Sequence, residues 1–166
     1  MRKFFLIAIL VIITGVLYAV LDNFRTIPPV PPTGMRAERV AIRIHGQNIL
    51  AEIANTEEEK EKGLGGRTAL GSNEGMFFPF PERGSYGFWM KGMKIPIDIV
   101  WISGTTVIGF EENVPFPQDA SVDDGKLPVY LPPSPVDGVL ELQAGKVKSI
   151  GLQAGDLADF ERGNGR

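Results

Sequence analysis

The strongest hydrophobic pattern in the chain is a long run without a charged residue, Phe4 to Leu21, which follows Met1-Arg2-Lys3. At about 1.5 Å per residue such a run forms a helix of about 27 Å, close to the ~30 Å hydrocarbon core of a bilayer. A cleaved signal peptide has the same basic start, but a cleavage site needs a pair of small residues and Leu17-Tyr18-Ala19 supplies only one. We therefore expect residues 1–21 to be a single transmembrane helix that stays uncleaved, with a signal peptide as the alternative.

Residues 22–36 have no hydrophobic period and contain Pro28-Pro29-Val30-Pro31-Pro32. Consecutive prolines favour the extended polyproline II conformation, which acts as a semi-rigid spacer. Because Arg2 and Lys3 favour a cytoplasmic N-terminus, this linker would hold the following domain, residues 37–160, outside the cytoplasm. The predicted location is the cell membrane, with the domain in the periplasm or at the cell surface.

Within residues 37–160 the hydrophobic pattern is that of strands. Val40, Ile42 and Ile44 alternate with other residues, as in a half-buried strand, and Ile49 to Ala54 follows after a turn, so we expect a hairpin. The same kind of pattern predicts further strands within residues 75–80, 97–101, 102–110, 139–142 and 157–160. Beyond them, residues 161–166 form a polar tail.

Two short helices are predicted from their end signals. Thr56 and Glu59 have the spacing of a capping box, and Gly63 suits the C-terminal cap of that helix. A second short helix is expected over Gly145 to Ile150. Between them, residues 115–135 are too rich in proline for the inside of a sheet, which predicts a long surface loop. The fold class is therefore mainly β (α+β).

Composition then narrows the classes of function. The chain has no cysteine, so disulfides, thiol chemistry and cysteine metal ligands are excluded. Its only histidine, His45, falls in the predicted hairpin turn, which argues against a zinc site or a serine–histidine triad. Lysine and arginine number 17 against 20 aspartates and glutamates, and an acidic chain without a basic cluster is a poor partner for nucleic acid. We expect no metal, no cofactor and no nucleic-acid partner.

Both tryptophans lie in one stretch, Phe88 to Trp101, which also places the carboxylate of Asp98 inside an apolar strand. A buried charge is costly unless it is paired or faces water, so Asp98 is either a structural tie or a working group. Glu141 presents the same choice inside Val139 to Leu142. Alternation along each strand leaves room for Asp98 and Glu141 to share a face, which would supply paired carboxylates for acid–base chemistry.

The residues near Asp98 also suggest a binding surface. Trp89 with Met90 and Met93 would form an apolar platform for a sugar ring or a peptide, although such side chains are more often part of a core. The ligand-binding candidates are Trp89, Lys91, Lys94, Asp98 and Arg67, and the catalytic candidates are Asp98 and Glu141. Their plain alternatives are exposed charges and structural ion pairs.

Several segments of the domain together match the pattern of a known family. They are Gly63-Leu64 with Arg67, Gly75-Met76-Phe77-Phe78-Pro79-Phe80, Phe88-Trp89-Met90-Lys91, Ile95-Pro96-Ile97-Asp98-Ile99, Val139-Leu140-Glu141-Leu142-Gln143-Ala144-Gly145 and Gly155-Asp156. Spanning about Val40 to Phe160, they resemble the uncharacterised family catalogued as domain of unknown function 192. Gly65 and Gly92-Met93 depart from the residues usual there. The resemblance implies a compact barrel-like mixed sheet with one or two short helices, often behind an export signal or anchor, and it implies no activity.

Three hypotheses for function follow. The first is a membrane-anchored extracytoplasmic module that binds a small molecule, glycan or peptide in the cell envelope, along the surface of Trp89, Lys91, Lys94 and Asp98. The second is an envelope hydrolase that uses Asp98 and Glu141 as paired carboxylates, and whether the chain is an enzyme stays open. The third is a protein-interaction module beside a membrane partner, which predicts an exposed apolar patch in place of a pocket.

Overall fold

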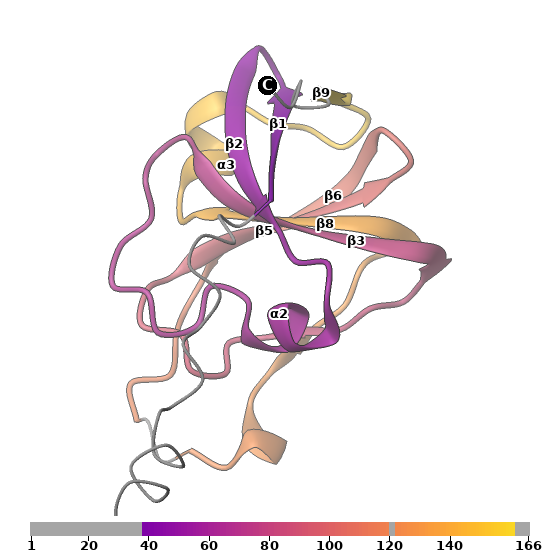
Figure 1. The fold of residues 1–166 in the computed structure, drawn as a ribbon. Helices are drawn as coiled ribbons and strands as arrows, with labels where there is room; N and C mark the ends of the chain where they lie inside the picture. Colours follow the sequence, from indigo (N-terminus) through magenta and orange to yellow (C-terminus); the bar gives the residue numbers. More distant parts are fainter. Residues whose placement is uncertain (1–37, 120–121, 162–166) are drawn as a thin grey trace, which may run out of the picture. The chain divides into compact units, whose positions relative to one another are not determined.

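The computed structural model describes residues 38–119 and 122–161 (Figure 1). The predicted membrane anchor (1–21), the linker (22–36) and residues 162–166 of the polar tail lie outside these ranges. Within the described ranges, no helix has the length and hydropathy needed to span a membrane.

The domain is built on one sheet of seven strands in the order β6-β5-β8-β3-β2-β1-β9. All neighbouring strands are antiparallel except β2 and β3, which run parallel because the chain crosses over through α2 between them. The sheet is therefore mixed, as expected. Its strands are β1 (Arg39–Ile44), β2 (Gln47–Ile53), β3 (Glu74–Gly84), β5 (Ile97–Ser103), β6 (Thr106–Val114), β8 (Val136–Gln143) and β9 (Ala158–Glu161).

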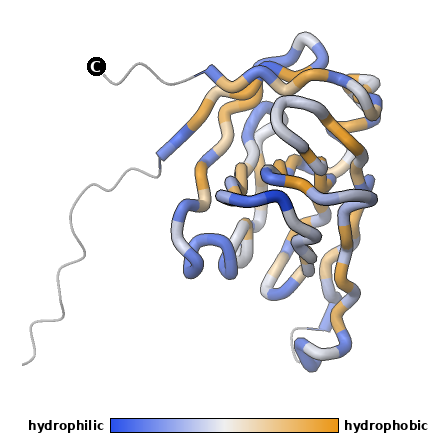
Figure 2. The backbone as a smooth tube through the Cα atoms, turned by 90° about the vertical axis from the view of Figure 1, so that its right-hand side faces the viewer, coloured by the Kyte–Doolittle hydropathy of each residue, from blue (hydrophilic) through white to orange (hydrophobic). Residues whose placement is uncertain are grey.

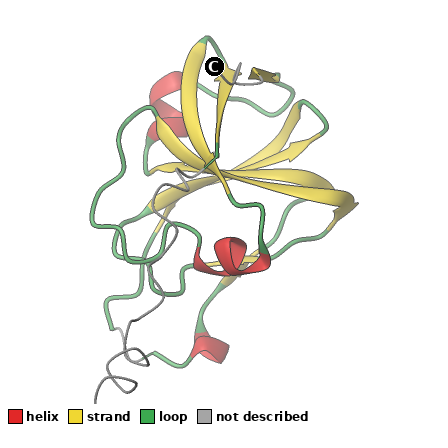
Figure 3. Ribbon diagram, in the orientation of Figure 1, coloured by secondary structure: helices red, strands yellow, loops and turns green. Residues whose placement is uncertain are grey.

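The sheet curls until its two edge strands meet at one end. The backbone N–H of Ala158 in β9 donates to the carbonyl of Thr105 at 2.8 Å, and the N–H of Val107 in β6 donates to Asp156 at 2.9 Å. A bridge between Thr106 and Leu157 adds to this closure. The result is a curled half-barrel, which confirms the expectation of a mainly β, barrel-like fold with short helices (Figure 3).

The two faces of the sheet each pack a separate hydrophobic core. The inner core fills the curl with side chains such as Ile42, Val100 and Leu140, and the outer core packs Phe78, Ile99 and Trp101 on the opposite face. Hydrophobic positions gather along the strands, and hydrophilic ones gather along the loops and helix α2 (Glu57–Lys62) (Figure 2). Strand β5 lies between both cores, and every residue from Ile97 to Ile102 is buried.

Helices α2 and α3 cover opposite faces of the central strands (Figure 1). In α2 (Glu57–Lys62), Thr56 Oγ1 accepts the N–H of Glu59 at 3.1 Å and the Glu59 carboxylate accepts the N–H of Thr56 at 2.9 Å. The predicted capping box is confirmed, and Gly63 ends the helix. Helix α3 (Lys146–Ile150) buries Val147 in the inner core.

The proline-rich segment 115–135 is largely a loop, as predicted, but it also contains two short elements. One is the 3₁₀ turn η1 (Asp124–Lys126), and the other is strand β7 (Val129–Tyr130), which pairs with β4 (Phe88–Trp89) in a separate two-stranded sheet. The sequence analysis missed this ribbon. A strand of two residues between prolines has no hydrophobic period to detect.

Candidate functional site

Asp98 is completely buried, and backbone N–H groups satisfy both of its oxygens. Asn113 and Gly145 donate to Oδ1 at 2.8 and 3.0 Å, and Val147 donates to Oδ2 at 2.8 Å. These three bonds satisfy the carboxylate without an arginine partner. They tie β5 to β6 and to the first turn of α3. Of the two roles considered for Asp98, the contacts are those of a structural tie.

The structure separates Asp98 from Glu141, the other predicted catalytic candidate. In the antiparallel pairing of β5 with β8, Asp98 stands opposite Leu142 while Glu141 stands opposite Ile99. Directly opposed residues share a face, so Asp98 faces the inner core and Glu141 faces the outer core. The expectation that these carboxylates share a face was wrong. Both faces of this sheet are apolar, so hydrophobicity along one strand does not fix its register with the next.

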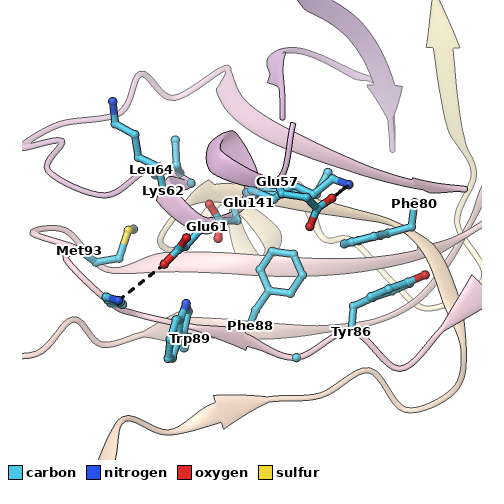
Figure 4. Close-up of a pocket in the computed structure, with 15 residues that line it drawn as sticks. Glu57, Glu61, Lys62, Leu64, Phe80, Tyr86, Phe88, Trp89, Met93 and Glu141 are labelled. Atoms are coloured by element: carbon cyan, nitrogen blue, oxygen red, sulfur yellow. Dashed lines mark hydrogen bonds and ion pairs between the residues drawn. The ribbon is translucent and has the colours of Figure 1, made fainter. Parts of the chain in front are cut away.

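Glu141 instead lies in a pocket between α2 and strand β4, with a volume of about 390 Å³ (Figure 4). We call it the α2–β4 pocket. Its lining residues are Glu57, Lys60, Glu61, Lys62, Gly63, Leu64, Phe78, Phe80, Tyr86, Gly87, Phe88, Trp89, Lys91, Met93 and Glu141. The carboxyl group lies beneath the end of α2, where a Cβ added to Gly63 would be 3.6 Å from Glu141 Oε2.

The carboxyl group of Glu141 is only partly satisfied. The residue is 5% exposed, and the backbone N–H of Leu64 donates to its carboxyl group. Its Oε2 has no hydrogen-bond partner among the described residues. Burial raises the pKa of Glu141 to about 8, although the Leu64 N–H and the charge of Arg67 act in the opposite direction. At neutral pH Glu141 is therefore mainly a neutral carboxylic acid.

Aromatic rings form one side of the α2–β4 pocket. Phe80 and Tyr86 stack with centroids 3.6 Å apart, and Phe88 meets Phe78 edge to face at 5.0 Å. Trp89 is 36% exposed at the pocket and pairs with Val129 of β7. We call Phe80, Tyr86, Phe88 and Trp89 the aromatic wall. It gives the pocket an apolar surface near the carboxyl group of Glu141.

Most charged side chains at the rim of the pocket form ion pairs. Lys60 bonds to Glu57 at 2.9 Å, and Lys91 bonds to Asp124 of η1 at 2.8 Å and approaches Glu61 to 3.8 Å (Figure 4). The hydrogen bond and charge of Asp124 raise the pKa of Lys91. Each lysine also lies over an aromatic ring, with Lys60 Nζ 5.2 Å from the centroid of Phe80 and Lys91 Nζ 5.2 Å from that of Trp89.

The ligand-binding candidates from the sequence do not all meet in one place. Trp89 and Lys91 line the α2–β4 pocket together with Glu141. Arg67 lines a neighbouring cavity of about 470 Å³, where its guanidinium is bonded to Glu52. Lys94 is exposed and lines another hollow, formed with Phe116 and the loop that follows it.

The sequence analysis missed Tyr86, Phe88, Phe80 and the acidic and basic residues of α2 as parts of a site. Aromatic residues in apolar stretches have the same pattern whether they pack a core or line a pocket, so only the chain path distinguishes them. His45 bonds to Asp156 at 2.8 Å and its side chain is 44% exposed, as expected for a turn residue. Among the residues that the structure describes, no group of three or more potential ligands could hold a metal ion.

Two solved structures are similar to this chain. One is a proposed transcription regulator from Sinorhizobium meliloti 1021, with 28% sequence identity and a TM-score of 0.66, covering 76% of this chain and 97% of that one. The other is a protein of unknown function from Novosphingobium aromaticivorans DSM 12444, also 28% identical, with a TM-score of 0.67, covering 80% of this chain and 91% of that one. No curated protein matches. A family model matches residues 40–160, and the chain belongs to that family, described as DUF192, Uncharacterized ACR.

Proposed function

We propose that this domain is a binding module that takes a small organic ligand into the α2–β4 pocket. The observation that carries the proposal is Oε2 of Glu141, a buried polar atom of a pocket-lining residue, which has no hydrogen-bond partner among the described residues. We further propose that the apolar run Phe4 to Leu21 holds the module at the cell membrane, with the domain on the extracytoplasmic side.

An unpartnered buried oxygen costs stability. Leaving a buried donor or acceptor unsatisfied typically costs about 1–3 kcal/mol, and most buried polar groups in folded proteins are satisfied. Leucine or methionine at position 141 would fill the same space without that cost. A group retained against stability, inside a cavity and with a strongly shifted pKa, is characteristic of a functional site.

The rest of the pocket supports a small ligand. Small-molecule sites typically have volumes of about 300–1,000 Å³, with mainly apolar walls and a few polar groups that fix orientation. The α2–β4 pocket, at about 390 Å³, lies at the small end of this range and combines the aromatic wall with the carboxyl group of Glu141. The ligand would displace no internal bond of Oε2, because none is present among the described residues.

Neither a paired-carboxylate hydrolase nor a DNA-binding regulator has comparable support. Asp98 faces the inner core, so the proposed pair of Asp98 and Glu141 does not meet in the pocket. The proposed transcriptional role of the Sinorhizobium structure would require phosphate contacts, whereas this chain has 17 basic against 20 acidic residues.

The proposal is tested by ligand-observed NMR on the full chain with a library of small polar and aromatic molecules. Molecules that bind the wild type should lose their signal with Glu141→Leu, which removes the polar group from the pocket. They should keep it with the control Glu112→Gln, which changes an exposed carboxylate on β6. The proposal fails if the library gives no binder, or if every binder is retained equally by Glu141→Leu.

A further inference from the structure

We propose that the α2–β4 pocket takes a neutral sugar ring, with its C–H face on the aromatic wall and a hydroxyl group bonded to Glu141. This inference rests on the proposed function and narrows it to one class of ligand. Three features of the pocket support it: its hydrogen-bonding group, the charges at its rim and its apolar surface.

The hydrogen-bonding group favours a partner that both donates and accepts. With a pKa raised to about 8, Glu141 is a carboxylic acid at neutral pH, so it carries an O–H donor as well as acceptor lone pairs. One bond is already made by the N–H of Leu64. A sugar hydroxyl can accept the acid proton and donate its own, and so can satisfy the group completely. An ammonium ligand can only donate, so it would leave the O–H of Glu141 without an acceptor.

The rim charges disfavour a cationic ligand. Lys60 is paired with Glu57, and Lys91 with Asp124 and Glu61, so these charges already balance one another. Their ammonium groups lie over the rings of Phe80 and Trp89, which are the positions that a cationic ligand would seek on an aromatic surface. A ligand cation would meet these ammonium groups at the rings. A neutral ring would stack on Phe88 and on the 36% exposed Trp89, because Tyr86 and Lys60 already cover Phe80.

The apolar surface suits a ring with one apolar face more than an extended chain. Stacked Phe80 and Tyr86 lie beside Phe88 and Trp89 in the lining of one compact pocket (Figure 4). A sugar ring has one apolar C–H face and a polar edge of hydroxyl groups, which matches a pocket with rings on one side and a carboxylic acid beside them. A pocket of about 390 Å³ limits the ligand to a short saccharide.

Saturation-transfer NMR on the full chain, kept in a detergent without a sugar headgroup, tests this directly. The sugar probes are glucose, N-acetylglucosamine and their β-1,4-linked dimers, and the competing classes are tetramethylammonium and N-acetylalanine amide. We expect a sugar to bind and Trp89→Ala to weaken it about tenfold through the loss of aromatic contact. Leu157→Ala, which shortens an exposed apolar side chain outside the pocket lining, should leave binding unchanged.

Two substitutions at position 141 test the hydrogen bond. Glu141→Gln keeps a neutral donor and acceptor and should hold sugar affinity within about threefold, whereas Glu141→Leu should abolish binding. If tetramethylammonium or the amide binds in a way that depends on Glu141, and no sugar binds, the sugar inference is overturned and the proposed function stands. The inference is also overturned if no probe binds, or if both Trp89→Ala and Glu141→Leu still bind the sugar. The library screen tests the proposed function separately.

Discussion

Asp98 and Glu141 lie on neighbouring strands, but their carboxyl groups point to opposite faces of the sheet, because Asp98 is opposite Leu142 and Glu141 is opposite Ile99. Both residues are buried. Asp98 accepts three backbone N–H groups, whereas Oε2 of Glu141 has no partner among the described residues. The same type of group is therefore fully hydrogen-bonded on one face and only partly satisfied on the other.

The first prediction concerns Asp98. Asp98→Asn should lower the free energy of unfolding by about 2–4 kcal/mol, because an amide NH₂ in place of Oδ1 or Oδ2 would face backbone N–H donors and leave them unsatisfied. Chemical denaturation of wild type and variant measures this. Asp159→Asn, at an exposed position on β9, is the matched control and should change stability by less than about 0.5 kcal/mol. An Asp98→Asn variant as stable as this control would contradict the structural role.

The second prediction is a pH dependence of stability that originates in Glu141. Its folded pKa of about 8 lies above the unfolded value of 4.5, so the folded state holds the proton more tightly. This contribution to stability is fully present below pH 4.5 and is lost as pH rises to about 8. Since each pKa unit corresponds to about 1.4 kcal/mol, the total loss is on the order of 5 kcal/mol.

Glu141→Gln should remove this dependence because an amide does not titrate. The stability difference between variant and wild type, measured by denaturation at a series of pH values, should therefore grow in favour of the variant from pH 4.5 to 8. Other groups around the pocket, such as Arg67, Lys60 and Glu57, are common to both proteins and cancel in the difference. Parallel pH profiles would show that Glu141 does not titrate as inferred.

Local patterns in the sequence predicted most elements of the fold. Alternation located the β1–β2 hairpin, and the spacing of Thr56 and Glu59 located α2 together with its capping box. The β4–β7 ribbon was missed because it depends on a contact between Phe88 and Tyr130, which are far apart in the sequence. No local pattern reports such a contact.

The site was harder to predict for the same reason. Alternation correctly placed neighbours within β5 on opposite faces, but the relation of Asp98 to Glu141 depends on the register of β5 with β8. In a sheet with one solvent-exposed face, the polar positions would have revealed that register. This sheet packs a hydrophobic core on each face. Trp89 and Lys91 were identified as binding candidates, and their neighbour Tyr86 was not.

The third prediction concerns Arg67 and Glu52. Arg67 bonds to the Glu52 carboxylate, which lies on β2, and this contact is the largest cause of the lowered pKa of Glu52. Both side chains are partly exposed, so solvent screens the pair. A double-mutant cycle with Arg67→Met and Glu52→Gln should give a coupling energy of about 0.5–1.5 kcal/mol in denaturation experiments. A coupling energy near zero would show that Arg67 does not fasten the segment after α2 to the sheet.

The last prediction connects the capping box to the proposed pocket. Helix α2 has no buried residue, so its position over the pocket depends on its ends. At the first turn, Thr56 Oγ1 accepts the backbone N–H of Glu59. Thr56→Ala should reduce stability by about 1 kcal/mol and raise hydrogen exchange in residues 57–62, while Thr56→Ser keeps the cap and should behave as wild type. Because Glu57, Lys60 and Glu61 line the pocket, Thr56→Ala should also weaken ligand binding, whereas Thr56→Ser should not. Equal exchange in both variants would mean that contacts other than the cap hold α2 in place, and α2 would then be a rigid part of the pocket.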